Sequence, residues 1–241
     1  HYMTQAGLLL LFLCAALSFL LFSRDKTRWL WGASFLLAVS CLTLTMTRSA
    51  WVGFVVAMAF ILLLYKPKTL VLVPVAVGLF LLLSPQPMKR RALSIFSPQS
   101  YANKQRLEYI KAGWKIISEF PVHGTGPDTV DMVFQDPKYD LSGEAKRNVH
   151  LHNNIIQIAA ERGIPALLAW LVFIAWAFFS LLRLLKNRGH FSYPYAAAAE
   201  AALLALFWAG LFEYNFADSE IAVLFLYLLT VPFAPLKKTE P

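Results

Sequence analysis

Hydrophobic residues occur along this chain in long runs that are separated by short polar segments. Seven runs stand out, of which the third and fourth are the shortest: residues 6–22, 29–46, 51–65, 70–84, 164–182, 196–212 and 221–236. A helix of about 20 apolar residues crosses the roughly 30 Å hydrocarbon core of a bilayer. The pattern therefore predicts an all-α, polytopic integral membrane helix bundle with about seven transmembrane helices.

Composition agrees with a membrane protein and excludes an ordinary soluble domain. Of the 241 residues, 58% are hydrophobic and only 15% are charged, and the mean hydropathy is +0.55. Cys14 and Cys41 lie in predicted spans, where they are expected to pack as small apolar residues without a disulfide. The first run has no basic leader or cleavage site, so we expect it to be a true span. Residue 1 is His, which indicates a fragment lacking upstream spans.

Lysine and arginine are unevenly distributed over the short connecting segments, which predicts orientation. One set of segments is basic: Arg24, Lys26, Arg28, Lys66, Lys68, Arg183, Lys186, Arg188, Lys237 and Lys238. The opposite set holds one basic and three acidic residues: Arg48, Glu213, Asp218 and Glu220. The first residues are therefore expected outside and the C-terminus in the cytoplasm. Residues 85–163 then lie outside, because long loops are exempt from the rule.

This topology divides the chain into three parts. Residues 1–84 would hold four transmembrane helices, residues 85–163 a large external loop with amphipathic helices, and residues 164–241 three more spans and a short cytoplasmic tail. Arg48, the loop and residues 213–220 would emerge on one face. The basic residues behind the formal net charge of +8 are distributed as the predicted topology requires. We therefore expect no nucleic-acid partner.

The external loop begins with an expected amphipathic helix over residues 101–120. Apolar residues at helical spacing form one face and charged residues the other: Leu107, Ile110, Trp114 and Ile117 against Lys104, Glu108, Lys111 and Lys115. The helix would either lie on the bilayer surface or direct Arg106 toward a phosphate. After Pro121, Gly124 and Gly126 indicate either a tight reversal or a weak phosphate-loop signal. Residues 130–147 are expected to be a polar surface segment with little regular structure.

A histidine pair follows at the mouth of the next span. His150 and His152 precede a short helix that Arg162 and Gly163 are expected to end, and Pro165 suits the first turn of the following span. The pair is open to three interpretations: metal ligands, a helix cap or a general base. We find no third or fourth metal ligand nearby in the sequence and no Asp-x-Asp pair, so we expect no metal.

These residues resemble a known family. His152-Asn153, followed after nine residues by Gly163, is similar to the histidine signature of the O-antigen ligase family, which is related to O-antigen polymerases and bacterial protein O-oligosaccharyltransferases. The surrounding motifs also match: Arg106, Trp114, Phe120-Pro121, Gly124-x-Gly126, Thr47-Arg48-Ser49 and the acidic segment 212–220. Val52 and Ala166 depart from the family pattern at packing positions. The family usually has about twelve spans, so about five would lie upstream.

The resemblance implies a multi-pass protein of the bacterial inner membrane whose active face is periplasmic. It implies an inverting, metal-independent and cofactor-free transfer of a glycan from undecaprenyl diphosphate to a lipid A-core sugar. The implied partners are this donor, this acceptor and membrane lipids. By the same resemblance His152 is the catalytic base, and Arg48 and Arg106 bind the diphosphate, with Arg147 as an alternative. Possible supporting residues complete the set: His150, Asn153, Glu213 and Asp218.

Other functions remain open from the sequence. An O-antigen polymerase would use the same donor, and the acceptor depends on the shape of a groove. A transporter of polysaccharide or lipid should show charged residues deep in its spans and internal repeats. Glu200 is the only charge clearly inside a predicted span, and we expect it to be an interfacial carboxylate. A non-catalytic assembly subunit is a further alternative.

Overall fold

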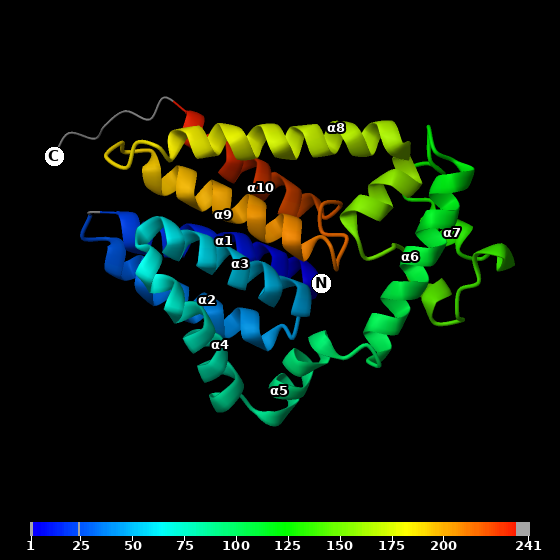
Figure 1. The fold of residues 1–241 in the computed structure, drawn as a ribbon, viewed down its shortest axis with the longest axis horizontal. Helices are drawn as coiled ribbons and strands as arrows, with labels where there is room; N and C mark the ends of the chain where they lie inside the picture. Colours follow the sequence, from blue (N-terminus) through cyan, green and yellow to red (C-terminus); the bar gives the residue numbers. More distant parts are fainter. Residues whose placement is uncertain (1, 24, 235–241) are drawn as a thin grey trace. The chain divides into compact units, whose positions relative to one another are not determined.

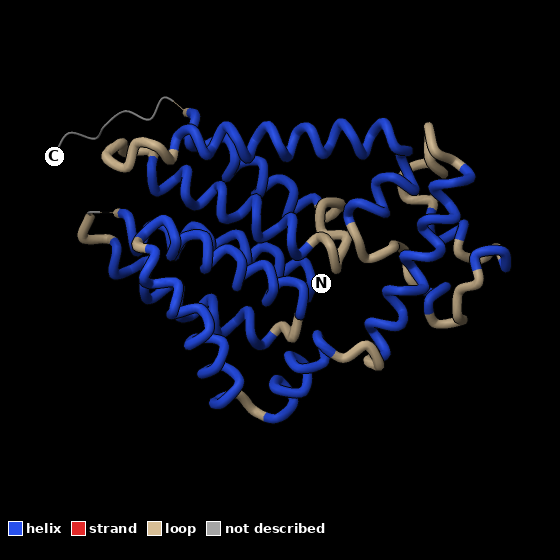
Figure 2. Tube along the Cα trace, in the orientation of Figure 1, coloured by secondary structure: helices blue, strands red, loops and turns tan. Residues whose placement is uncertain are grey.

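The computed structural model of the chain describes residues 2–23 and 25–234. These residues form helices and connecting loops without strands (Figure 2). The longer helices, labelled in Figure 1, are α1 (Tyr2–Phe22), α2 (Arg28–Leu44), α3 (Arg48–Tyr65), α4 (Leu72–Leu83), α5 (Gln86–Leu93), α6 (Tyr101–Glu119), α7 (Val130–Val133), α8 (Asn154–Leu184), α9 (Tyr193–Ala209) and α10 (Ser219–Thr230). Short 3-10 turns are η1 (Pro67–Val71), η2 (Ser94–Phe96), η3 (Pro137–Tyr139), η4 (Ala145–Arg147) and η5 (Val231–Phe233). The predicted all-α fold is confirmed.

Within the described residues, three helices are long and apolar enough to cross a membrane: Tyr2–Phe22, Arg48–Tyr65 and Asn154–Leu184. The other apolar helices are shorter: Arg28–Leu44, Pro67–Leu83 and Ser219–Phe233. The 12 residues of α10 rise about 18 Å, less than the roughly 30 Å of a hydrocarbon core. Each of the seven hydrophobic runs is helical over most of its described length, but seven spans stay a prediction. Arg24, Lys237, Lys238 and the end of the last run lie outside the described residues.

The chain forms two compact units. Unit 1 consists of His1–Ala92, Trp176–Ala209 and Ala217–Pro241, and unit 2 of Leu93–Ala175 and Gly210–Phe216. In unit 1, α9 packs against both α1 and α3. The close packing depends on small residues, since a Cβ at Gly53 of α3 would lie 2.6 Å from the Ala205 carbonyl oxygen of α9. The alanine-rich sequence of α9 thus permits three helices to approach closely.

Glu200 lies in the alanine-rich part of α9 and is fully buried. Neither of its carboxylate oxygens has a hydrogen-bond partner among the described residues. Glu200 is thus enclosed by protein, and its place relative to the membrane interface stays a prediction. The alanines around it on α9 are buried as well, and α9 packs against α1 and α3.

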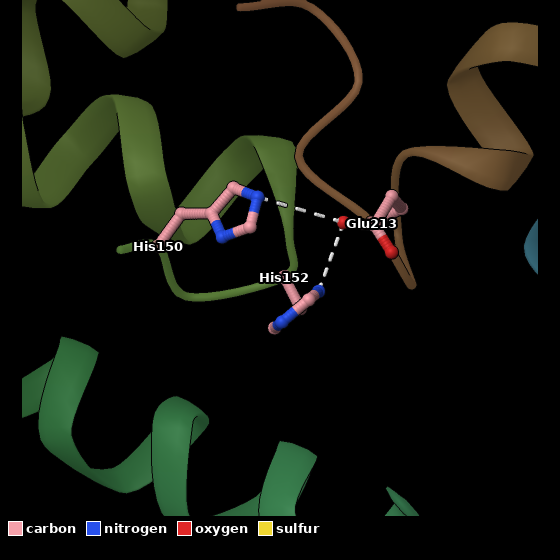
Figure 3. Close-up of side chains that lie close together, drawn as sticks. All are labelled: His150, His152 and Glu213. Carbon is pink, nitrogen blue, oxygen red and sulfur yellow. Dashed lines mark hydrogen bonds and ion pairs between the residues drawn. The ribbon is translucent and has the colours of Figure 1, made fainter. Parts of the chain in front are cut away.

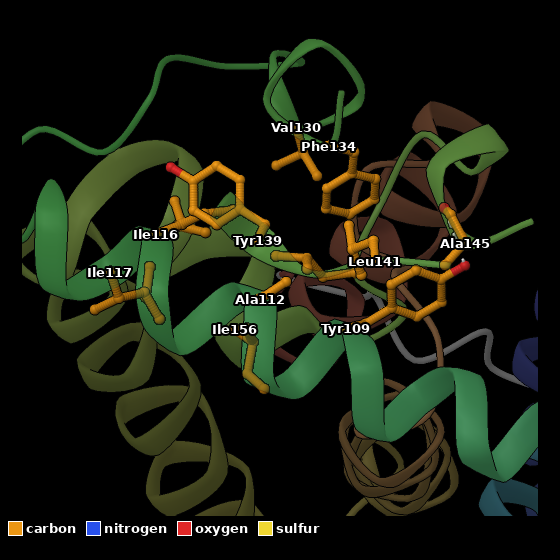
Figure 4. Close-up of a cluster of buried hydrophobic side chains, with 13 residues drawn as sticks. Tyr109, Ala112, Ile116, Ile117, Val130, Phe134, Tyr139, Leu141, Ala145 and Ile156 are labelled. Atoms are coloured by element: carbon orange, nitrogen blue, oxygen red, sulfur yellow. Dashed lines mark hydrogen bonds between the residues drawn. The ribbon is translucent and has the colours of Figure 1, made fainter. Parts of the chain in front are cut away.

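Unit 2 has its own hydrophobic core, built on α6 (Figure 4). Its buried members are Tyr109, Ala112, Ile116, Ile117, Val130, Phe134, Tyr139, Leu141, Ala145, Leu151, Ile156, Ala159 and Ala160. The rings of Tyr109 and Phe134 are stacked with centroids 5.8 Å apart. Residues 130–147 have little regular structure, as predicted, and most of them are exposed, but the segment is not wholly polar. They supply five of these core residues and cover α6.

The amphipathic helix is confirmed as α6. Ile110 and Ile117 of the expected apolar face pack against the core, but the other two residues of that face do not. Leu107 and Trp114 are exposed, at 53% and 63%, whereas Tyr109, Ala112 and Gly113 are buried. The small residues decide this, because a Cβ at Gly113 would overlap the Ile156 side chain of α8. Size at the contact therefore outweighs hydrophobicity in choosing the face. The exposed face with Leu107 and Trp114 is suited to a bilayer surface.

The glycine-rich turn docks onto the end of the first part of α8. The backbone N–H groups of Thr125 and Gly126 donate to the Ala160 and Glu161 carbonyl oxygens, both at 2.9 Å. At Gly163, with φ 80°, α8 leaves helical geometry. A Cβ added at this glycine would overlap the Val122 carbonyl oxygen. Two amides of the turn are thus used inside the protein, which supports the tight reversal over a phosphate loop. The helix end at Gly163 is confirmed.

Candidate functional site

His152 and Glu213 form the centre of the candidate site, in unit 2. Nδ1 of His152 lies 2.9 Å from Oε1 of Glu213, and Nε2 of His150 lies 3.8 Å from the same oxygen. Figure 3 shows both imidazoles directed at this one carboxylate oxygen. The two imidazole centroids are 4.6 Å apart. The carboxylate is 10% exposed and the imidazoles 16% (His152) and 26% (His150), so the cluster is partly buried and the histidines form its more exposed side.

The start of α8 holds the histidine and the glutamate segments together. The Asn153 carboxamide oxygen accepts the Ile156 N–H at 3.0 Å, as an N-cap does, while its Nδ2 donates to the Leu211 carbonyl oxygen at 2.9 Å. The Asn154 N–H donates to the Gly210 carbonyl oxygen at 2.7 Å. One cap residue therefore serves both the helix and the glutamate-bearing loop, which supports the role expected for Asn153.

His152 has a left-handed backbone conformation, with φ 50°. Such a φ is uncommon outside glycine, and strained residues cluster at functional sites. Asp128 shares the feature, with φ 57°, at the end of the glycine-rich turn. The conformation at His152 turns the chain from the extended segment into α8 and directs the imidazole at Glu213.

A stripe of buried polar side chains on α8 was not recognised from the sequence. The Gln157 carboxamide accepts the Leu151 N–H at 2.6 Å and donates to Glu161 Oε1 at 2.8 Å. Glu161 Oε1 also accepts the Asp128 N–H at 3.1 Å. Polar residues at positions 154, 157 and 161 follow helical spacing, and this was the available signal. The stripe joins the histidine segment to the glycine-rich turn.

Two tyrosines flank the imidazoles. The Tyr109 ring lies 5.5 Å from that of His152, and the Tyr214 ring 6.0 Å from that of His150, centroid to centroid. Burial raises the pKa of the Tyr109 phenol to about 12, against the lowering effect of its hydrogen bond with Asn148. At neutral pH Tyr109 is therefore a neutral wall of the site.

Arg106 lies beside the glutamate segment. Its Nη2 donates to the Phe212 carbonyl oxygen at 3.1 Å, and its guanidinium lies 5.7 Å from the centroid of the Phe212 ring. Arg147, the alternative phosphate ligand, is an exposed residue at the end of η4. Of the two loop arginines, Arg106 is the one next to Glu213.

Glu213 is buried against the two histidines. Burial alone would raise the pKa of this carboxyl, but the hydrogen bond with His152 and the charge interactions with His152, His150 and Arg106 together lower it below its ordinary value. An ionised carboxylate against Nδ1 holds a proton on that nitrogen and leaves Nε2 as the lone-pair nitrogen of a neutral ring. The arrangement suits His152 to accept a proton at Nε2.

The other expected site residues belong to unit 1. Arg48 is the first residue of α3 and only 5% exposed, which argues against a side chain that merely reaches for water. Asp218 precedes α10, and its Oδ2 accepts a hydrogen bond from the Thr4 hydroxyl at 2.7 Å. Whether either residue joins His152 in one site stays a prediction.

The expectation that no third metal ligand lies near the histidines is wrong. One ligand atom from each of His150, His152 and Glu213 lies within 4.8 Å of the others. Glu213 is 61 positions from His152, so neighbouring sequence could not reveal it. The donor set of two imidazoles and one carboxylate fits a metal ion that favours nitrogen.

Comparison with known protein families adds to this geometry. Residues 33–171 match the family described as O-Antigen ligase, which covers more than half of the chain. The chain belongs to the O-antigen ligase family. The matched segment includes Arg48, Arg106 and His152 but ends before Glu213. No curated protein sequence matches the chain.

Membership identifies the general activity. An O-antigen ligase or polymerase is a membrane glycan transferase of lipopolysaccharide biosynthesis, and it acts on a lipid-linked glycan and a lipid acceptor. The apolar helices of this O-antigen ligase family member agree with a membrane location. The resemblance found in the sequence motifs is thus confirmed at the level of the family.

Proposed function

We propose that this protein is an O-antigen ligase, which transfers a polysaccharide from undecaprenyl diphosphate to a sugar of the lipid A-core. The reaction takes place on the periplasmic face of the bacterial inner membrane, without a metal and with inversion at the anomeric carbon. The observation that carries the proposal is the His152 Nδ1–Glu213 Oε1 contact of 2.9 Å in a chain of this family. This contact supports a base that carries its proton on Nδ1 and accepts the acceptor's proton at Nε2.

His152 acts as the general base. Nδ1–H donates to the Glu213 carboxylate, and Nε2 accepts the proton of the acceptor hydroxyl. The hydroxyl oxygen forms a bond to the anomeric carbon on the face opposite the diphosphate. The carbon–oxygen bond to the diphosphate breaks, and undecaprenyl diphosphate leaves with the bonding electrons. Glu213 is a positioning residue in this scheme, and its negative charge stabilises the imidazolium that forms.

Arg106 and Arg48 bind the diphosphate and neutralise the charge that develops as it leaves. Guanidinium groups bind phosphate oxygens through two parallel hydrogen bonds, and such charge-assisted bonds stabilise a leaving group without a metal. The place of Arg106 beside Glu213 supports its role. For Arg48 the support is the Thr47-Arg48-Ser49 motif and its place as the first residue of α3.

The acceptor distinguishes a ligase from a polymerase. The lipopolysaccharide of a strain in which the full-length gene is deleted should run as uncapped core on a gel, with polymer accumulating on the lipid carrier. Plasmid-borne protein should restore the capped ladder. Core that carries a single repeat unit would instead identify an O-antigen polymerase and overturn the ligase assignment.

A further inference from the structure

The cluster of His150, His152 and Glu213 has a donor set that the transfer reaction does not need. A base requires one imidazole and one orienting carboxylate, yet a second imidazole is directed at the same oxygen (Figure 3). The three ligand atoms lie within 4.8 Å of one another, and the histidines form the more exposed side of the cluster. Two histidines and a glutamate are a ligand set that proteins use for Zn²⁺, with the fourth position left to water.

The spacing of the ligand atoms is close to what Zn²⁺ demands. Bonds of about 2.0 to 2.2 Å in tetrahedral geometry put ligand atoms roughly 3.3 Å apart. The two distances to Glu213 Oε1, 2.9 Å and 3.8 Å, lie on either side of that value. A hard ion such as Mg²⁺ prefers oxygen ligands and does not fit two imidazoles.

We propose that His150, His152 and Glu213 form an inhibitory Zn²⁺ site that switches off glycan transfer. The inhibition rests on the proposed function, whereas the binding site does not. Zn²⁺ takes the lone pair of His152 Nδ1, so the single proton of the neutral ring moves to Nε2. Nε2 then donates a hydrogen bond and can no longer accept the proton of the acceptor hydroxyl. The ion also withdraws Glu213 from its role in orienting the base.

Calorimetry on the purified full-length protein tests the site without reference to catalysis. Protein stripped with EDTA and then freed of chelator should bind one Zn²⁺ per chain and show no saturable heat with Mg²⁺. His150→Gln and Glu213→Gln each remove one ligand and should weaken Zn²⁺ binding at least about 100-fold, because loss of even an outer-shell partner costs 10- to 100-fold. His190→Gln is the matched control, since His190 lies before α9 and bonds to Ser192. It should bind Zn²⁺ like the wild type.

Transfer assays test the inhibition. In excess EDTA the protein should transfer glycan, Zn²⁺ should abolish transfer, and renewed EDTA should restore it. His150→Gln should need at least about 100-fold more Zn²⁺ for half-inhibition, relative to its own metal-free rate.

Equal Zn²⁺ affinity in His150→Gln, Glu213→Gln and His190→Gln, or no stoichiometric binding, would overturn the site. Zn²⁺ bound at the cluster with unchanged transfer would overturn the inhibition. Stoichiometric binding in a protein that never transfers glycan would support the site and refute the proposed function.

Discussion

Nδ1 of His152 and Oε1 of Glu213 are 2.9 Å apart although 61 positions separate the two residues in the chain. The contact is built into the fold of unit 2, because Asn153 and Asn154 bond to the carbonyl oxygens of Leu211 and Gly210. Each hydrogen bond joins the histidine segment to the loop that carries Glu213, between α9 and α10. In this O-antigen ligase family member His152, the proposed base, and Glu213 are therefore positioned by the same helix start.

Glu213→Gln should slow glycan transfer by about 10²- to 10⁴-fold, the range associated with a positioned base and its orienting acid. The amide keeps the shape of the side chain but loses the charge that holds the proton on Nδ1. Turnover of the purified variant at saturating donor measures the effect. Glu220→Gln is the matched control, because Glu220 is an exposed acid in the same segment. Equal rates in the two variants would remove Glu213 from the mechanism.

Arg106→Lys should lower turnover much more than Arg147→Lys. Lysine keeps the charge but loses the planar guanidinium that binds two phosphate oxygens. The guanidinium of Arg106 bonds to Phe212, next to Glu213, whereas Arg147 is an exposed residue at the end of η4. Transfer rates and donor binding of the two variants, measured side by side, check this. A larger loss of turnover in Arg147→Lys would indicate that Arg147, at the end of η4, is the second phosphate ligand. Arg48→Lys should be impaired in the same way as Arg106→Lys.

Gly163→Ala should destabilise unit 2. The backbone conformation at this position, φ 80° and ψ 169°, costs an L-residue about 1 to 3 kcal/mol, and the added Cβ would also overlap the Val122 carbonyl oxygen. Thermal unfolding of the purified protein should show a clearly lower melting temperature. Gly143→Ala is the control, because nothing lies within 4 Å of a Cβ at Gly143. Equal melting temperatures would show that the break in α8 tolerates a side chain.

The helices and several of their ends could be predicted from the sequence, but the faces that pack could not. Hydrophobic length predicts α1 and α3, and Gly163 marks the break in α8. On α6 the periodicity favoured Leu107 and Trp114, whereas small residues determine the real contact. Hydrophobicity patterns describe what a helix can bury, and the choice among its faces depends on how closely a partner helix can approach.

The candidate site was predictable in its residues and unpredictable in its pairings. His152 and Glu213 were both expected in the site from motifs, yet their hydrogen bond depends on tertiary folding over 61 positions. The burial of Asn154, Gln157 and Glu161 could not be predicted, because polar residues at helical spacing are equally typical of an exposed helix face. Local sequence shows which side chains are costly to bury. Only the fold shows which hydrogen-bond partners offset that cost.

The membrane topology can be tested by cysteine labelling of the full-length protein, after Cys14 and Cys41 are replaced by alanine. A cysteine at the exposed Ser142 should react with an impermeant thiol reagent in intact spheroplasts. A cysteine at the exposed Asn187 should react only after lysis, because its segment carries Arg183, Lys186 and Arg188. The opposite pattern would put His152 in the cytoplasm and contradict periplasmic transfer.

The turnover of purified full-length His152→Ala tests the central claim most directly. If His152 removes the proton of the acceptor hydroxyl, transfer should fall by at least about 10²-fold, while insertion into the membrane and donor binding stay normal. His190→Ala, which changes a histidine before α9, is the matched control. A rate for His152→Ala close to that of the wild type, with donor bound normally, would contradict the role of His152 as the base.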